Sequence, residues 1–186
     1  NGNTLAVAAS GDRGISVVDL TTKKQKFHET FMGLNIGQLQ IGKDQQHVYT
    51  TWMTYRGFPL NVANIRQGWV LGSRVGRVRL DESTRREAMA LDPRGRAVAD
   101  PYGFALTSDE QRMVVAAGGT HELLVYRATD LPLKDVGSDD HVPDAVLKDS
   151  DRFFRIELGG RPQGLKIAKD DKTVYVANYF ANTVQV

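Results

Sequence analysis

The chain has 186 residues, of which 41% are hydrophobic and 25% are charged, and its formal net charge is +2. This length suits one domain with a sizeable core, and the ordinary composition excludes disordered and collagen-like chains. The chain contains no cysteine, which excludes disulfides, thiolate chemistry and a Cys-x-x-Cys-His haem attachment within these residues. The small net charge argues against nucleic acid as a partner, and no apolar run is long enough to span a bilayer.

The first predicted elements are strands of a truncated repeat. Residues 5–19 end on the alternating run Ile-Ser-Val-Val-Asp, and another strand is available at 26–30. The sequence opens on Asn-Gly-Asn-Thr, without methionine, a basic region or an apolar region. We therefore expect a processed or excised piece that lacks its targeting information.

Three further copies of the repeat superimpose along the rest of the chain. In each copy an apolar pair at alternate positions ends one strand, an aspartate follows three residues later, and a second strand begins four residues after the aspartate. These positions are Leu39/Ile41, Asp44 and Val48; Phe104/Leu106, Asp109 and Met113; Leu165/Ile167, Asp170 and Val174. Alternation predicts half-buried strands, and an aspartate side chain that bonds the backbone predicts a tight turn between them.

Third strands are expected at 123–125 and 184–186, and the segment 154–158 supplies a fourth. Three hairpin-linked strands with a fourth in the linker match the blade of a β-propeller. The fold class is therefore all-β, a β-propeller of four-stranded antiparallel blades, with about three and a half blades present as one partial domain. We expect the tail of blade 1 at 1–31, blade 2 at 32–98, blade 3 at 99–158 and the start of blade 4 at 159–186.

Two stretches of opposite charge, expected to be insertions, lengthen the copies. The first covers about 52–100, and all nine basic residues between 56 and 96 are arginine. The second covers about 127–152, with seven aspartates and two lysines between 130 and 151. Any function should lie in these two stretches, because the repeats themselves carry core and turn residues.

The arginine-rich stretch interleaves aromatic rings with arginines. Arginine offers a rigid fork for carboxylates and stacks on aromatic rings, so this composition suits recognition of a protein or an anionic ligand. We expect an interaction surface of Tyr55, Arg56, Arg66, Trp69 and Arg74. Two alternatives stay open: pairing with the chain's own acidic stretch, and a solvated strand face for Arg77 and Arg79.

The acidic stretch offers a candidate calcium site. Asp139, Asp140 and Asp144 could supply oxygen ligands, although their spacing does not match an EF-hand loop, and a solvated acidic loop is the simpler interpretation. The histidines His28, His47, His121 and His141 show no paired metal-binding spacing. No catalytic or cofactor-binding residue is identified.

The last copy resembles the YVTN β-propeller repeat. The resemblance rests on Pro162, Gly164, the Val-Tyr-Val-Ala-Asn run at 174–178 and the Asn-Thr-Val run at 182–184. It covers the repeat cores, about half of the chain. The resemblance implies an exported bacterial protein, periplasmic or at the cell surface, whose propeller binds partners without catalysis. Some similar propellers continue into a di-haem domain resembling cytochrome c peroxidase, which implies haem in a neighbouring domain.

Three functions follow, in order of preference. The first is a non-enzymatic binding or scaffolding propeller, whose partner is a protein or the remainder of its own propeller. The second is a propeller accessory to a haem-containing redox enzyme. The third is a lactonase-like hydrolase, which would need acidic residues and histidines converging on a metal.

Overall fold

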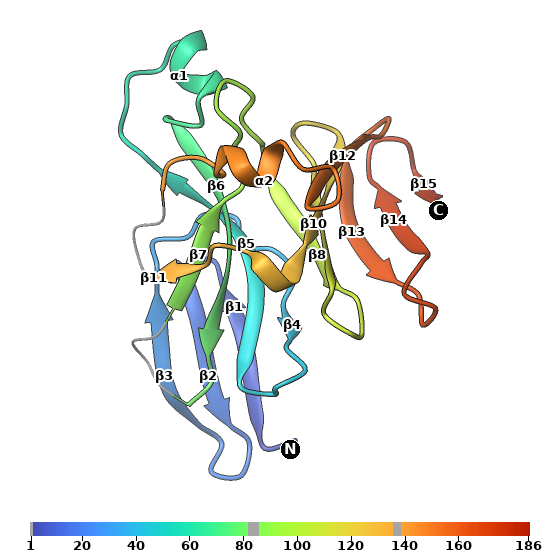
Figure 1. The fold of residues 1–186 in the computed structure, drawn as a ribbon. Coiled ribbons are helices and arrows are strands. Elements are labelled where there is room, and N and C mark those ends of the chain that lie inside the picture. Colours follow the sequence, from blue (N-terminus) through green and yellow to red (C-terminus); the bar gives the residue numbers. More distant parts are fainter. Residues whose placement is uncertain (1, 82–85, 136–138) are drawn as a thin grey trace.

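The computed structural model describes residues 2–81, 86–135 and 139–186, and Figure 1 shows a chain of antiparallel sheets. Sheet 1 contains β1 (Thr4–Ala9), β2 (Gly14–Asp19) and β3 (Lys24–Thr30). Sheet 2 contains β4 (Gln40–Ile41), β5 (His47–Tyr55), β6 (Leu71–Arg79), β7 (Arg86–Ala90) and β11 (Lys134–Asp135). Sheet 3 contains β8 (Pro101–Leu106), β9 (Arg112–Ala117), β10 (Glu122–Arg127) and β12 (Phe153–Glu157). Sheet 4 contains β13 (Pro162–Ile167), β14 (Val174–Asn178) and β15 (Thr183–Gln185).

The all-β prediction is confirmed, and helices are confined to two long connections. Helix α1 (Val62–Arg66) lies between β5 and β6. The 3-10 helix η1 (Ala128–Asp130) and α2 (Asp144–Leu147) lie between β10 and β12. Among the described residues, no helix has the length and apolar character needed to cross a bilayer.

The sheets pack face to face, with a hydrophobic cluster at each junction. Ile15 and Val17 of sheet 1 meet Val48 and Trp52 of sheet 2. Met89 of sheet 2 is in the cluster that contains Phe104 and Val115 of sheet 3, and Val114 of sheet 3 is in the cluster that contains Leu165 of sheet 4. Since side chains alternate across a strand, the middle sheets are buried on both faces. Sheets 1 and 4 each leave one face uncovered, with exposed Leu5 and Tyr175.

The aspartates of the repeat have the turn role predicted for them. Each carboxylate accepts a hydrogen bond from the backbone N–H two residues later, and the turn is therefore held by the side chain itself. The donors are Gln46 for Asp44 at 2.8 Å, Gln111 for Asp109 at 2.9 Å and Lys172 for Asp170 at 2.9 Å.

Left-handed backbone recurs at equivalent places in successive sheets. The residue after each turn aspartate has positive φ: 54° at Gln45, 58° at Glu110 and 55° at Asp171. Positive φ also occurs at the residue just before β2, β10 and β15. The values are 57° at Arg13, 60° at His121 and 51° at Asn182. This geometry favours glycine, yet none of these positions has one, so each turn carries local strain.

The expectation of an insertion over 52–100 is wrong for most of its length. That segment completes β5 and supplies β6 and β7, two strands of sheet 2. The extra length is the loop with α1 between β5 and β6. The acidic stretch does lie between two strands of sheet 3, but its β11 pairs with β7 and extends sheet 2.

Two glutamines, Gln38 just before β4 and Gln40 within it, connect sheet 2 to sheets 3 and 4. The side-chain oxygen of Gln38 accepts hydrogen bonds from the backbone N–H of Phe104 in β8, at 3.3 Å, and of Leu165 in β13, at 3.1 Å. The side chain of Gln40 accepts from the N–H of Leu106 at 2.8 Å and donates to its carbonyl at 3.3 Å. The first strands of three sheets are thus tied together at one place.

Candidate functional site

An ion pair is among the contacts that join the arginine-rich and aspartate-rich stretches. Arg56, just after β5, pairs with Asp140, and the guanidinium lowers the pKa of that carboxyl. The Asp140 side chain is 47% exposed. The alternative in which the two charged stretches pair with one another is therefore realised at this point.

Aromatic packing joins the same two stretches. The Trp69 ring stacks on Phe58, with centroids 5.4 Å apart, and contacts the His141 ring at 6.3 Å. His141 Nε2 donates to the backbone carbonyl of Gln67 at 3.0 Å. The acidic loop is therefore held on the loop that leads from α1 to β6.

Arg74 is buried rather than on an open surface. It lies in β6, is 6% exposed, and its guanidinium lies 3.6 Å from the carboxylate of Asp92, which is 0% exposed. Asp92 also accepts hydrogen bonds from the backbone N–H groups of Ser73 at 2.7 Å and Val98 at 2.8 Å. Burial raises the pKa of Asp92 to about 7, against the opposing effect of these donors and Arg74, and burial lowers the pKa of Arg74.

The other residues of the expected interaction surface lie on a protruding loop. Tyr55 is 67% exposed at the end of β5, and Arg66 is exposed at the end of α1, without an ion-pair partner among the described residues. The Asn61 side chain accepts from the N–H of Asn64 at 2.8 Å and caps α1. No residue of α1 is buried, and Leu60 before it is 78% exposed. Figure 1 shows α1 at the far end of the molecule from sheet 1.

A cleft of about 750 Å³ opens where sheet 2 extends past the end of β3. Residues Arg56, Arg74 and Arg86 line it together with Asp140, and its apolar wall includes Phe31, Met32 and Trp52. The rings of Phe31 and Trp52 have centroids 4.5 Å apart.

Arg86 joins the cleft to sheet 1. It donates to the Glu29 carboxylate at 3.1 Å and to the backbone carbonyl of Thr30. Glu29 is buried, and burial raises its pKa against the opposing effect of Arg86.

The candidate calcium ligands are each paired with a cation of their own. Asp139 pairs with Lys134 at 2.8 Å, Asp140 with Arg56, and Asp144 with Lys148 at 3.8 Å. Across residues 2–81, 86–135 and 139–186, no group of three or more His, Cys, Asp and Glu side chains gathers as a metal site would require. Calcium binding remains a prediction, which melting of the Asp139→Asn/Asp140→Asn variant with and without calcium checks.

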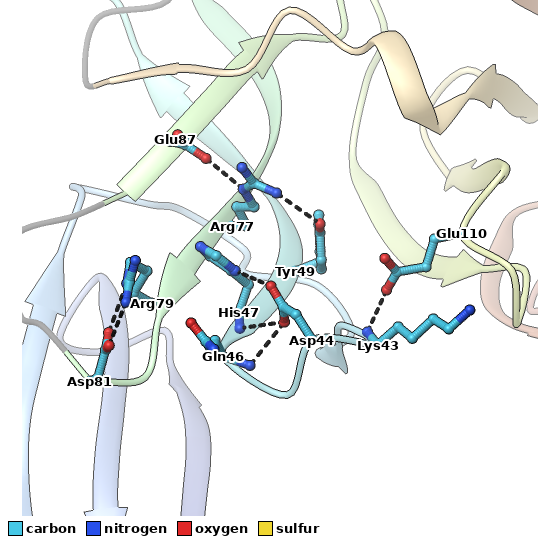
Figure 2. A network of polar contacts seen from close by, with 10 residues as sticks. All are labelled: Lys43, Asp44, Gln46, His47, Tyr49, Arg77, Arg79, Asp81, Glu87 and Glu110. Atoms are coloured by element: carbon cyan, nitrogen blue, oxygen red, sulfur yellow. Dashed lines mark hydrogen bonds and ion pairs between the residues drawn. The ribbon is translucent and has the colours of Figure 1, made fainter.

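A second polar network lies on the opposite face of sheet 2 and around the turn before β5 (Figure 2). Arg77 donates to Glu87 and to the hydroxyl of Tyr49, the latter at 3.2 Å. Arg79 pairs with Asp81, which lowers the pKa of that carboxyl to about 2. Arg77 and Arg79 therefore lie on a strand face, as one of the two alternatives predicted. Both are ion-paired rather than merely solvated.

Sequence reasoning missed Arg86, Glu29 and the aromatic pair of Phe31 and Trp52. Their sequence separation is large, because the cleft is formed by β3, β5, β6 and β7 together. No local sequence signal marks this set, because the cleft depends on how sheet 1 packs on the longer strands of sheet 2.

Comparison with known proteins identifies the fold. No family model matches the sequence, which leaves the YVTN resemblance without support from a family, and no curated protein matches it either. Solved structures do: hydrazine synthase from Kuenenia stuttgartiensis matches with a TM-score of 0.74 and 20% identity over 99% of this chain. That enzyme and a further solved neighbour, dihydro-heme d1 dehydrogenase NirN, are β-propeller proteins. The fold is β-propeller-like.

Two further solved structures agree over nearly the whole chain. The complex of KlAtg21 with the coiled coil of AgAtg16 has a TM-score of 0.54 at 11% identity over 96% of this chain, and dihydro-heme d1 dehydrogenase NirN in complex with DHE has 0.51 at 14% over 95%. The chain spans 55% of the hydrazine synthase chain, 47% of the second and 39% of NirN. At these identities the likeness concerns the fold alone.

Proposed function

We propose that this chain is part of a non-catalytic β-propeller that supports the haem-containing part of an exported redox protein. The observation that carries the proposal is the match of 99% of the chain to part of hydrazine synthase, at a TM-score of 0.74. The name of a second neighbour, dihydro-heme d1 dehydrogenase, is that of a haem-handling redox enzyme. Sheets 1 to 4 would then be successive blades, with boundaries near residues 31, 98 and 158, in the periplasm or at the cell surface.

The ion pairs inside the fold favour a structural rather than a catalytic role. The buried charges of Glu29 and Asp92 are engaged by Arg86 and Arg74, and Glu122 is engaged by Arg155. Such pairs hold neighbouring strands and loops together. The described histidines lie apart and bond backbone or single side chains, so the geometry offers no centre for the lactonase-like alternative.

The test uses the natural full-length protein, isolated from its own host. We expect haem in the purified protein, measured as the pyridine haemochrome, and its location outside residues 1–186, shown by mass spectrometry of haem-bearing peptides. A haem-free protein would overturn the redox proposal.

The second candidate is a stand-alone binding or scaffolding propeller. It is favoured by the exposed apolar residues of the α1 loop, which include Leu60, Val62 and Ile65. Exposed apolar patches of this kind mark interaction surfaces. A haem-free protein that retains one partner on affinity purification, and loses it in the Leu60→Ser/Ile65→Ser variant, would establish this candidate instead.

A further inference from the structure

The cleft beside Arg56 exists because strands of unequal length pack together. Strands β5 and β6 each have nine residues, whereas β1 and β2 have six and β3 has seven. The face of sheet 2 that packs on sheet 1 therefore continues past the end of β3. In Figure 1 the ends of β5 and β6 near α1 lie beyond sheet 1. The side chains on this extension have no sheet opposite them.

Strand register places the lining residues on this one face. Trp52 pairs with Arg74, Val48 pairs with Val78, and Val78 pairs in turn with Arg86 in the next strand. Since Val48, Trp52 and Val78 all face sheet 1, Arg74 and Arg86 also face it. The aromatic wall and the guanidinium groups thus belong to the same surface by register.

Arginines outnumber acids on the cleft wall, although each of these arginines also has a carboxylate partner in the fold. The wall includes the three arginines Arg56, Arg74 and Arg86 but the single acid Asp140. The partners of Arg74 and Arg86 are Asp92 and Glu29, which are buried and do not line the cleft. A guanidinium has five N–H donors in a fixed fork. An arginine that pairs with one carboxylate inside the fold therefore keeps donors for a second acceptor in the cleft.

We infer that this cleft binds a small organic anion, a carboxylate attached to an apolar or aromatic body. The carboxylate would bond Arg56, and the apolar body would lie against Phe31, Met32 and Trp52. A volume of about 750 Å³ is within the usual range for small-molecule sites, and an apolar wall with a few convergent polar groups is their usual composition. This ligand site is independent of the proposed haem-supporting role.

The experiment uses fluorescence of the full chain, in which Trp52 and Trp69 are the two tryptophans. In a Trp69→Phe background, Trp52 reports on the cleft alone. Titration with 3-phenylpropionate is expected to give a saturable change in Trp52 emission. The uncharged 3-phenylpropionamide is expected to bind about tenfold more weakly, because it cannot make the charge-assisted hydrogen bonds.

Two variants probe the site by different means. Arg56→Gln removes one guanidinium and should weaken 3-phenylpropionate binding about tenfold. Thr54→Phe fills the cleft, which Thr54 lines, and should abolish binding with all three arginines retained. Arg77→Gln is the matched control, because Arg77 lies on β6, the strand paired with β5, is also ion-paired, and faces the other way. It should bind as the parent does.

Several results would overturn the inference. These are no saturable response at millimolar 3-phenylpropionate, equal binding of the amide, or binding that survives both Arg56→Gln and Thr54→Phe. Melting curves show which variants are folded, and each conclusion is drawn from folded variants only. None of these measurements depends on haem, so failure here leaves the redox proposal standing.

Discussion

Asp92 brings one carboxylate into contact with several separate segments. Its side chain accepts from Ser73 in β6 and from Val98, and its backbone carbonyl accepts from the N–H of Val142 at 3.0 Å. Gly68, at φ 68°, lies so close that an added Cβ would be 2.8 Å from the Asp92 carboxylate. The α1 loop, β6 and the acidic loop are all positioned by this single residue.

The protonation of Asp92 should make stability depend on pH. Its pKa is about 7 in the folded chain against an ordinary value of 3.8, so the folded state holds a proton that the unfolded state has released between these values. Stability should therefore fall as pH rises through about 7. Urea midpoints of the wild type at about pH 5.5 and 8.5 should show this loss, and Asp92→Asn should remove most of it; Glu29, whose pKa burial also raises, adds to the slope in the same direction.

Asp81→Asn is the control for this slope. Asp81 is exposed and its pKa of about 2 lies far below the window, so its removal should leave the slope unchanged. The carboxyls of Asp44, Asp109 and Asp170 also have lowered pKa values and contribute stability that is lost only in acid. A wild-type slope that persists in Asp92→Asn would contradict the assignment.

The turn aspartates should each contribute measurably. In Asp109→Ala the backbone N–H of Gln111 and the hydroxyl of Thr107 lose their acceptor, which should lower the free energy of unfolding. Asp12→Ala, at an exposed aspartate, should cost much less. Equal urea midpoints for the two variants would show that the turn bond is dispensable.

Among the elements, sequence alternation located the hairpins of the repeat but not all of sheet 2. The strands predicted to begin at Val48, Met113 and Val174 are present, since each sets alternating apolar residues against a short turn. Strand β6 could not be separated from the loop before it, because its glycines and arginines interrupt the apolar alternation. Two of those arginines, Arg74 and Arg77, are paired with acids that lie at least ten residues away.

The candidate site was predicted only in part for a similar reason. Local composition pointed to Arg56 and Trp69, and both lie where the charged stretches meet. The roles of Arg86 and Glu29 depend on contact between β3 and β7, 57 residues apart in sequence. Nor did composition show that Arg74 is buried, because burial there results from Asp92 and the loop around it.

At turn residues with left-handed backbone, we expect glycine to give a more stable chain than alanine, which is the reverse of the usual order. Arg13 has φ 57° and an exposed side chain, so Arg13→Gly should be more stable than Arg13→Ala by about 1 kcal/mol. At Arg112, the first residue of β9, the order should reverse, because glycine costs roughly 0.5–1 kcal/mol relative to alanine within a strand. Thermal unfolding of the four variants measures both differences, and the same order at both sites would contradict the turn geometry.

At the scale of the whole molecule, the sheets are joined by hydrophobic faces and by the polar contacts of Gln38 and Gln40. The Gln38 side chain reaches two sheets at once, through the backbone N–H groups of Phe104 and Leu165. Neighbouring sheets therefore share a polar anchor as well as a core, and relative movement of the sheets would break it.

Loss of this anchor should loosen sheets 3 and 4 together. Gln38→Met keeps the size of the side chain but removes the acceptor, and should cost about 1–3 kcal/mol in stability. Gln38→Glu retains an acceptor for both N–H groups and should lose less. Hydrogen exchange at the amides of Phe104 and Leu165 is expected to accelerate in Gln38→Met, and unchanged exchange at both would refute the anchoring role.

Strand β11 has a mechanical consequence. It leaves sheet 3 after β10, pairs with β7 of sheet 2, and the chain then returns to sheet 3 as β12. A pulling force applied to the chain ends cannot extract sheet 3 without also peeling the edge of sheet 2. In single-molecule stretching, the two sheets should therefore release their length in one step, whereas most repeat arrays give way one unit at a time.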